Sequence, residues 1–128
     1  MSIENWIYNR IISSSNINAI INGNCFPDNV PSSAIPGVCY TYLTQSNNLI
    51  CRQPIITVRN VSNSQTDCVT LSELLYSLFD NTTTRIQTMT TDGYRIENCE
   101  VIKNIPCLYD FTNFVYDGIL DIKIYYER

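Results

Sequence analysis

The C-terminal end of the chain places the strongest constraint on the fold. Apolar side chains occupy every second position of residues 120–126, namely Leu120, Ile122, Ile124 and Tyr126. Asp121 and Lys123 lie between them and would point to the opposite side of an extended strand. A strand with one apolar and one polar face is typical of an antiparallel sheet that is covered on one side. We therefore expect a sheet whose apolar face is covered by other segments.

Two segments have the apolar spacing of helices that could cover this face. Residues 3–13 carry apolar side chains three and four positions apart: Ile3, Trp6, Ile7 and Ile11. Residues 66–80 carry four leucines at helical spacing, which we interpret as a core face: Leu71, Leu74, Leu75 and Leu78. The segment 64–67 resembles a capping box and predicts the start of this second helix. A short helical turn, capped by Asn16 and stopped by Gly23, is expected after the first helix.

The first half of the chain also predicts a hairpin. Residues 24–37 contain three prolines and are expected to form an extended loop. Residues 38–44 and 49–61 are rich in β-branched and aromatic side chains and predict two strands joined by a turn at 46–48. Pro54 interrupts the second of these strands, so we expect an edge or a bulge there.

A second hairpin is predicted around Asp92 and Gly93, with strands at 82–90 and 94–102. A loop containing Pro106 should separate it from the last strand. With 128 residues the chain fits one domain, residues 1–128. The predicted class is α+β, with a mostly antiparallel sheet of four to five strands and two main helices packed on one face.

The composition argues against most catalytic and nucleic-acid-binding functions. The chain has no histidine, the usual general base and commonest metal ligand, and its formal net charge is −4. Asp117 and Asp121 would share one strand face but lie roughly 13 Å apart, too far for a glycosidase pair. No glycine-rich phosphate loop is present. We therefore expect no enzyme, no cofactor and no bound metal, and the N-terminal segment does not read as a secretory signal.

The cysteines are expected to be reduced packing residues. There are six: Cys25, Cys39, Cys51, Cys68, Cys99 and Cys107. None is part of a C-x-x-C pair, and free cysteine is among the most buried residue types. A disulfide framework is the alternative.

The candidate binding residues are aromatic and crowd residues 108–117. They are Tyr109, Phe111, Phe114 and Tyr116. One interpretation is that these rings cap the core beside the last strand. The other is that some of them, above all Phe111 and Phe114, form an exposed anchor for a protein partner, because Asp110, Thr112 and Asn113 around them indicate a solvated surface.

Several landmarks follow one another along the chain. The N-terminal helix leads into Asn24-Cys25-Phe26-Pro27, and a loop ends in Ala34-Ile35-Pro36. A tyrosine-rich strand at 38–42 follows, then the helix at 66–80. The closing loop and strand run from Leu108-Tyr109-Asp110 to 118–126. In the order of these landmarks, nearly the whole chain resembles the tail terminator, or tail completion, proteins of long-tailed bacteriophages, the family of the phage lambda tail terminator.

The resemblance implies a structural protein of the virion tail and neck, assembled in the host cytoplasm. Six copies would form a ring that caps the tail tube and joins it to the head–tail connector, with no catalysis and no membrane. DNA would pass through the ring without specific binding, consistent with six copies of a chain of charge −4, 6 × −4 = −24. The alternatives are a head-completion or connector neck protein and a monomeric host-interaction module, and a histidine-free enzyme would need an exposed cysteine of low pKa.

Overall fold

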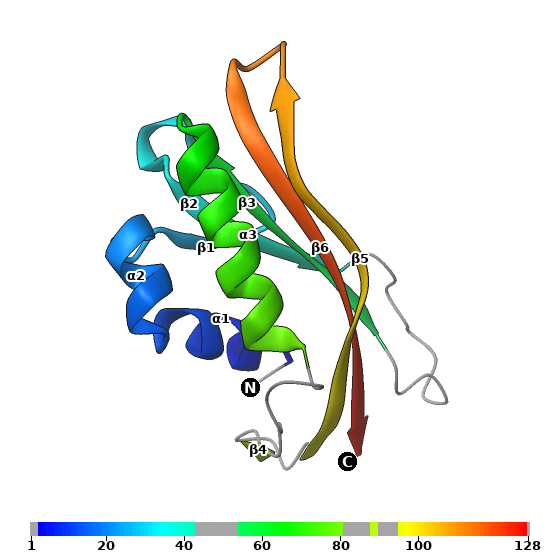
Figure 1. Cartoon of the computed structure of the whole chain (residues 1–128). Helices are drawn as coiled ribbons and strands as arrows, with labels where there is room; N and C mark the ends of the chain where they lie inside the picture. Colours follow the sequence, from blue (N-terminus) through cyan, green and yellow to red (C-terminus); the bar gives the residue numbers. More distant parts are fainter. Residues whose placement is uncertain (1–2, 43–53, 81–87, 90–94, 128) are drawn as a thin grey trace.

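The computed structural model describes residues 3–42, 54–80, 88–89 and 95–127 (Figure 1). In chain order the elements are α1 (Ile3–Ile12), α2 (Ser15–Ile21), β1 (Cys25–Pro27), the 3-10 turn Ser32–Ala34, β2 (Gly37–Tyr42), β3 (Ile55–Ser62), α3 (Gln65–Phe79), β4 (Thr88–Met89), β5 (Arg95–Asp110) and β6 (Val115–Glu127). The α+β class is confirmed.

The strands form one sheet in the order β1-β2-β3-β6-β5-β4. All neighbouring strands are antiparallel except β1 and β2, which are parallel. The described residues thus give six strands, where four to five were predicted. The difference comes from β1 and β4, which are three and two residues long.

The helices lie on one face of the twisted sheet, as predicted (Figure 1). In α3, Leu71 and Leu75 are buried while Leu74 and Leu78 are partly buried against the same core, so the leucine face is confirmed as core. The core continues into α1 through Ile7 and Ile11. The strand residues that face the helices in this core are Val38, Val58, Leu120, Ile122 and Ile124.

Hydrogen bonds at the helix ends show why these helices begin and end where they do. The Asp67 amide donates to the Ser64 side chain at 3.3 Å, which confirms the predicted start of α3. The predicted cap of α2 is wrong, because Ser14 rather than Asn16 accepts from the Ile17 amide. The helix stops at Asn22, whose left-handed backbone (φ 51°) precedes that of Gly23 (φ 82°).

Two predictions for the first half of the sheet need correction. Residues 24–37 are not entirely loop, because β1 pairs with β2 there. The run 49–61 does not supply a sheet edge, because β3 begins after Pro54 and lies between β2 and β6. Pro54 instead accepts a hydrogen bond from the Ile124 amide at 3.0 Å through its carbonyl, which needs no N–H of its own. The pairing of the two strands is confirmed, while the turn at 46–48 lies outside the described residues.

The loop predicted around Pro106 is also wrong. β5 runs through it, with register shifts against β6 between Ile96 and Asn98, Val101 and Lys103, and Ile105 and Leu108. Pro106 lies in the third shift, where it is not paired with a residue of β6. Its missing N–H therefore removes no hydrogen bond between the two strands. Of the strand predicted at 82–90, the structure describes only β4, which pairs antiparallel with β5 as the predicted hairpin requires. The predicted turn at Asp92 and Gly93 lies outside the described residues.

The alternation in β6 is confirmed for three of its four apolar positions and wrong at one polar position, while the side chain of the fourth, Tyr126, lies outside the described residues. Leu120, Ile122 and Ile124 are buried in the core. Asp121 is only 7% exposed, and the Thr57 hydroxyl donates a hydrogen bond to its Oδ1 at 2.7 Å, which satisfies the buried carboxylate. The two residues are direct cross-strand neighbours in β3 and β6.

Gly118 lies where β6 passes under α3. A Cβ at this position would meet the Ser72 hydroxyl and the Asn60 side-chain amide. The Asn60 amide donates to the Ser72 oxygen at 3.0 Å, and the Ser72 hydroxyl donates to the Pro106 carbonyl at 2.6 Å. The missing side chain of Gly118 therefore lets a polar bridge connect β3, α3 and β5.

We expect Gly118→Ala to lower the free energy of unfolding by roughly 1–3 kcal/mol, because the added methyl group overpacks this bridge. Urea titration monitored by circular dichroism measures the loss. Ser72→Ala removes the crowded hydroxyl, so the double variant should lose less stability than the sum of the two single variants. Strict additivity would contradict the close approach.

Candidate partner-binding site

The β5–β6 hairpin extends beyond the helices at one end of the molecule (Figure 1). Its end, residues 108–117, is called the tip below. The Asp110 carboxylate organises the turn by accepting from the amides of Thr112 and Asn113 at 2.9 and 3.2 Å and from the Asn113 side chain at 2.9 Å. The hydrogen bond from the Asn113 side chain, followed by those from the two amides, lowers the pKa of Asp110. The turn is thus held by hydrogen bonds among its own residues.

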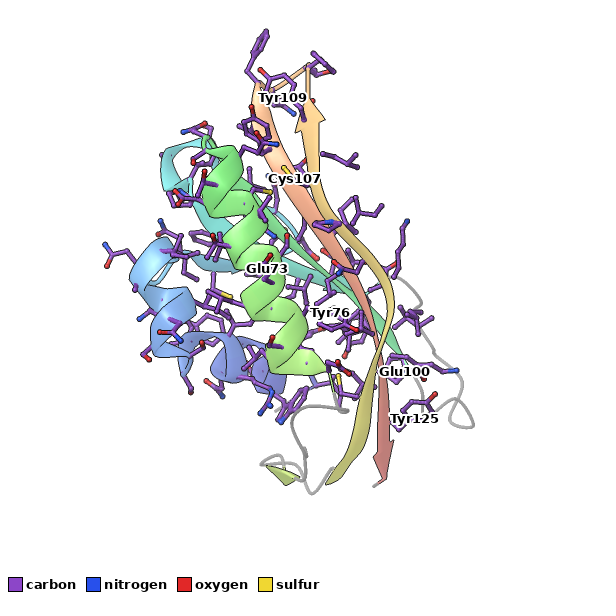
Figure 2. The ribbon with its side chains drawn as sticks, in the orientation of Figure 1. Glu73, Tyr76, Glu100, Cys107, Tyr109 and Tyr125 are labelled. Carbon is purple, nitrogen blue, oxygen red and sulfur yellow. The ribbon has the colours of Figure 1, made fainter. Side chains whose placement is uncertain are left out.

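The rings of the tip lie outside the core. Phe111 is 79% exposed and Phe114 is 71% exposed, and neither belongs to a hydrophobic cluster of the described residues. The Tyr109 ring contacts those of Phe111 and Tyr116, with centroids 4.8 and 4.9 Å apart in edge-to-face geometry. Figure 2 shows Tyr109 on the hairpin above the end of α3. The structure therefore places all four predicted residues on one projection and removes Phe111 and Phe114 from the role of capping the core.

Phe114 also has an unusual backbone. Its φ of 57° is left-handed, a region that bulky side chains rarely adopt. The Phe114 amide donates to the Asp110 carbonyl at 2.8 Å, which closes the turn in this conformation. Glycine or asparagine would adopt it more easily, so the phenyl ring is present at an energetic cost.

Two exposed apolar residues of β5 were not predicted as part of the site. Leu108 is 49% exposed and Ile102 is 46% exposed. Ile102 falls in a register shift of β5, and Leu108 follows the one that contains Pro106. Ile102 was predicted within the strand 94–102, and Leu108 follows the predicted Pro106 loop; no local pattern marks the register shifts beside them.

A cavity of about 400 Å³ lies at the root of the tip, on the sheet face opposite the helices. Val30, Val61 and Val115 form part of its wall, and Arg59 and Asp117 supply charge. Arg59 Nε and Asp117 Oδ1 are buried without a hydrogen-bond partner. Burial raises the pKa of Asp117, an effect that Arg59 partly offsets. Because these two atoms are inaccessible to solvent, a ligand in the cavity would not reach them.

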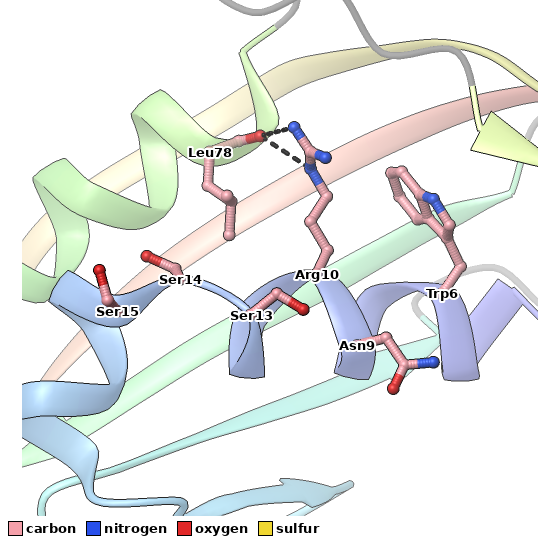
Figure 3. Close-up of a pocket in the computed structure, with 7 residues that line it drawn as sticks. All are labelled: Trp6, Asn9, Arg10, Ser13, Ser14, Ser15 and Leu78. Carbon is pink, nitrogen blue, oxygen red and sulfur yellow. Dashed lines mark hydrogen bonds between the residues drawn. The ribbon is translucent and has the colours of Figure 1, made fainter.

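A larger cavity, about 490 Å³, lies where α1 meets the end of α3 (Figure 3). Its charged residue, Arg10, donates from Nε and Nη2 to the Leu78 carbonyl at 3.1 and 2.9 Å. The guanidinium carbon also lies 5.7 Å from the centre of the Trp6 ring. These contacts cap the C-terminal end of α3, so we assign Arg10 a structural role.

The described thiols have the properties of packing residues. Within the described part of the chain no disulfide joins Cys25, Cys39, Cys68, Cys99 or Cys107, and all but Cys107 are buried. Burial raises the pKa of Cys25, Cys68 and Cys99 to about 12, so only a small fraction of each thiol is thiolate at neutral pH and nucleophilic attack by these thiols is slow. The prediction that the thiols are mostly buried is confirmed for these positions, while their reduced state stays a prediction. Cys51 lies outside the described residues.

Neither the family models, nor the curated proteins, nor the solved structures contain a match to this chain. Within the part of the chain that the structure describes, no three His, Cys, Asp or Glu side chains gather as a metal site would require. No helix in that part is long and apolar enough to cross a membrane.

Proposed function

We propose that this chain is a structural virion protein that forms a ring on the end of a phage tail tube and joins it to the head–tail connector. The observation that carries the proposal is the tip, where Phe111 and Phe114 are held in solvent on a hairpin with its own turn network. Aromatic residues are enriched among the hot spots of protein interfaces. The resemblance of the sequence to tail completion proteins supplies the identity of the partners.

The sheet offers an edge for the contact between copies. Among the described residues, β4 pairs with β5 only at Arg95 and Ile96, so the outer edge of β5 from Asn98 to Asp110 carries no strand. Unpaired backbone groups at such an edge can be covered by a neighbouring copy, and a head-to-tail contact that closes gives a ring. The register shifts within β5 restrict regular pairing to short stretches. We propose that the contact between copies lies at this edge of β5. The edge that Pro54 predicted in the run 49–61 is not open to a neighbouring copy along β3, because β3 lies between β2 and β6.

The proposal predicts rings of six copies on tail tubes. Tubes made by a phage that lacks this gene should be incubated with the purified chain and imaged by negative stain. We expect a ring at one end of each tube and recovery of head joining. Monomers that bind no tube would favour the host-interaction module, and binding to the head connector alone would favour a connector protein.

A further inference from the structure

Two thiols from distant parts of the sequence meet at the root of the tip. Cys68 lies in the first half of α3, and Cys107 lies in the register shift of β5 that contains Pro106. The Cys68 thiol donates to the Pro106 carbonyl at 3.7 Å and is also within hydrogen-bonding contact of the Cys107 side chain. Figure 2 shows Cys107 beside the upper half of α3.

The two thiols differ in access to solvent. Cys68 is completely buried, whereas Cys107 is half-buried and is the more exposed of the described cysteines. The other close pair, Cys25 and Cys39, is divided by the sheet, because Cys25 packs in the main core and Cys39 packs on the opposite face. A reagent from solvent would therefore meet Cys107 first, and Cys68 is the thiol positioned to react with the product.

We propose that Cys68 and Cys107 form a redox-active pair that closes to a disulfide when the protein meets a low-molecular-weight disulfide. The Cys107 thiolate attacks one sulfur of the reagent, the reagent's S–S bond breaks, and one thiolate leaves. Cys68 then loses its proton to solvent and attacks the Cys107 sulfur, which expels the second reagent thiolate. The two protein thiols are oxidised by two electrons in total, and the reagent is reduced to two thiols.

The second step should be slow and strongly dependent on pH. Burial, together with the hydrogen bond to Cys107, raises the pKa of Cys68 to about 12. The thiolate is the attacking species, and its fraction rises about tenfold per pH unit below the pKa. We therefore expect the rate of closure to increase about tenfold per pH unit between roughly pH 7 and pH 9.

Closure would connect α3 covalently to β5 at the point where the hairpin leaves the helix-covered part of the sheet. The crosslink would restrict movement of the tip relative to the helices. The redox state of this pair would then control the position of Phe111 and Phe114.

The test uses the chromogenic disulfide 5,5′-dithiobis(2-nitrobenzoate), with Cys51→Ser in every protein so that Cys51 contributes no signal. The Cys107 reaction should release one equivalent of thionitrobenzoate, and closure should release a second in a slower phase. Cys68→Ala should retain the first phase and lose the second, leaving a stable mixed disulfide on Cys107. Cys107→Ala should lose both phases. Cys39→Ala, a buried thiol on the opposite face, should retain both.

Mass spectrometry identifies the bond directly. After reaction, the protein with Cys68 and Cys107 intact should have lost the mass of two hydrogen atoms and should yield a crosslinked peptide pair containing these two residues. It should also show slower hydrogen exchange in the tip than the reduced form. A second phase that persists in Cys68→Ala, or a crosslink between any other cysteines, would overturn the proposal.

Discussion

Phe111→Asp is expected to fold as the unchanged protein does and to fail in completing tails. The side chain is 79% exposed, so its replacement should change the free energy of unfolding by no more than about 0.5 kcal/mol. A hot-spot ring at an interface contributes about 2 kcal/mol or more, which corresponds to a loss of affinity of roughly 30-fold or more. Thermal melting followed by circular dichroism measures the first effect. Negative stain of tubes incubated with the variant measures the second.

Phe114→Gly should remove the exposed ring without destabilising the fold, which makes it a cleaner test of the ring than Phe111→Asp. Glycine adopts the left-handed backbone of this position without strain, so the variant should be as stable as the unchanged protein or more stable by up to about 1 kcal/mol. It should nevertheless join tubes poorly, because the exposed ring is gone. Asn16→Asp in α2 provides a control that adds a charge at an exposed site away from the tip. Normal tail completion by both tip variants would contradict the assignment of the tip as the docking surface.

The sequence predicts α3 and β6 well because their signals are local. The leucines of α3 and the alternating residues of β6 each face one continuous core, so a periodic pattern is sufficient to identify the element and its buried face. The same reasoning fails at Asp121. Its burial depends on Thr57, a partner 64 positions away whose pairing is set by the register of β3 and β6.

The path of β5 could not be read from the sequence for a related reason. A proline normally ends a strand, and Pro106 was interpreted in this way. In the structure Pro106 lies in a register shift between β5 and β6, and its carbonyl accepts hydrogen bonds from Ser72 and Cys68 of α3. Tertiary contacts therefore maintain the strand where the local preference opposes it.

The composition of the candidate site was visible in the sequence, but its exposure was not. Four rings among polar residues fit a cap on the core as well as they fit an anchor. The choice depends on how far the hairpin extends past the helices, which depends on the lengths of β5 and β6 and on their turn at Asp110. Because Pro106 was expected to lie in a loop, the predicted strand 94–102 is shorter than β5, which continues to Asp110.

Truncation to alanine should lower the free energy of unfolding strongly at one phenylalanine and hardly at all at another. Phe79, at the end of α3, is completely buried, and its ring contacts that of Trp6 edge to face with centroids 6.2 Å apart. Phe79→Ala should lower the free energy of unfolding by roughly 3–5 kcal/mol through lost burial and the cavity left behind. Phe111→Ala removes the same atoms from solvent-exposed space and should cost no more than about 0.5 kcal/mol.

Urea unfolding of the two variants measures this difference directly. Domains of this size have total stabilities of about 5–15 kcal/mol, so Phe79→Ala should shift the midpoint to much lower urea with an unchanged slope. Phe111→Ala should overlay the unchanged protein in urea and lose affinity for tubes. Equal losses of stability would mean that the tip packs against the body of the protein, and its rings would then have to be assigned to the core. A large difference in unfolding free energy between the two variants would mean that the Phe111 ring does not contribute to folding stability, which leaves its surface free to bind a partner.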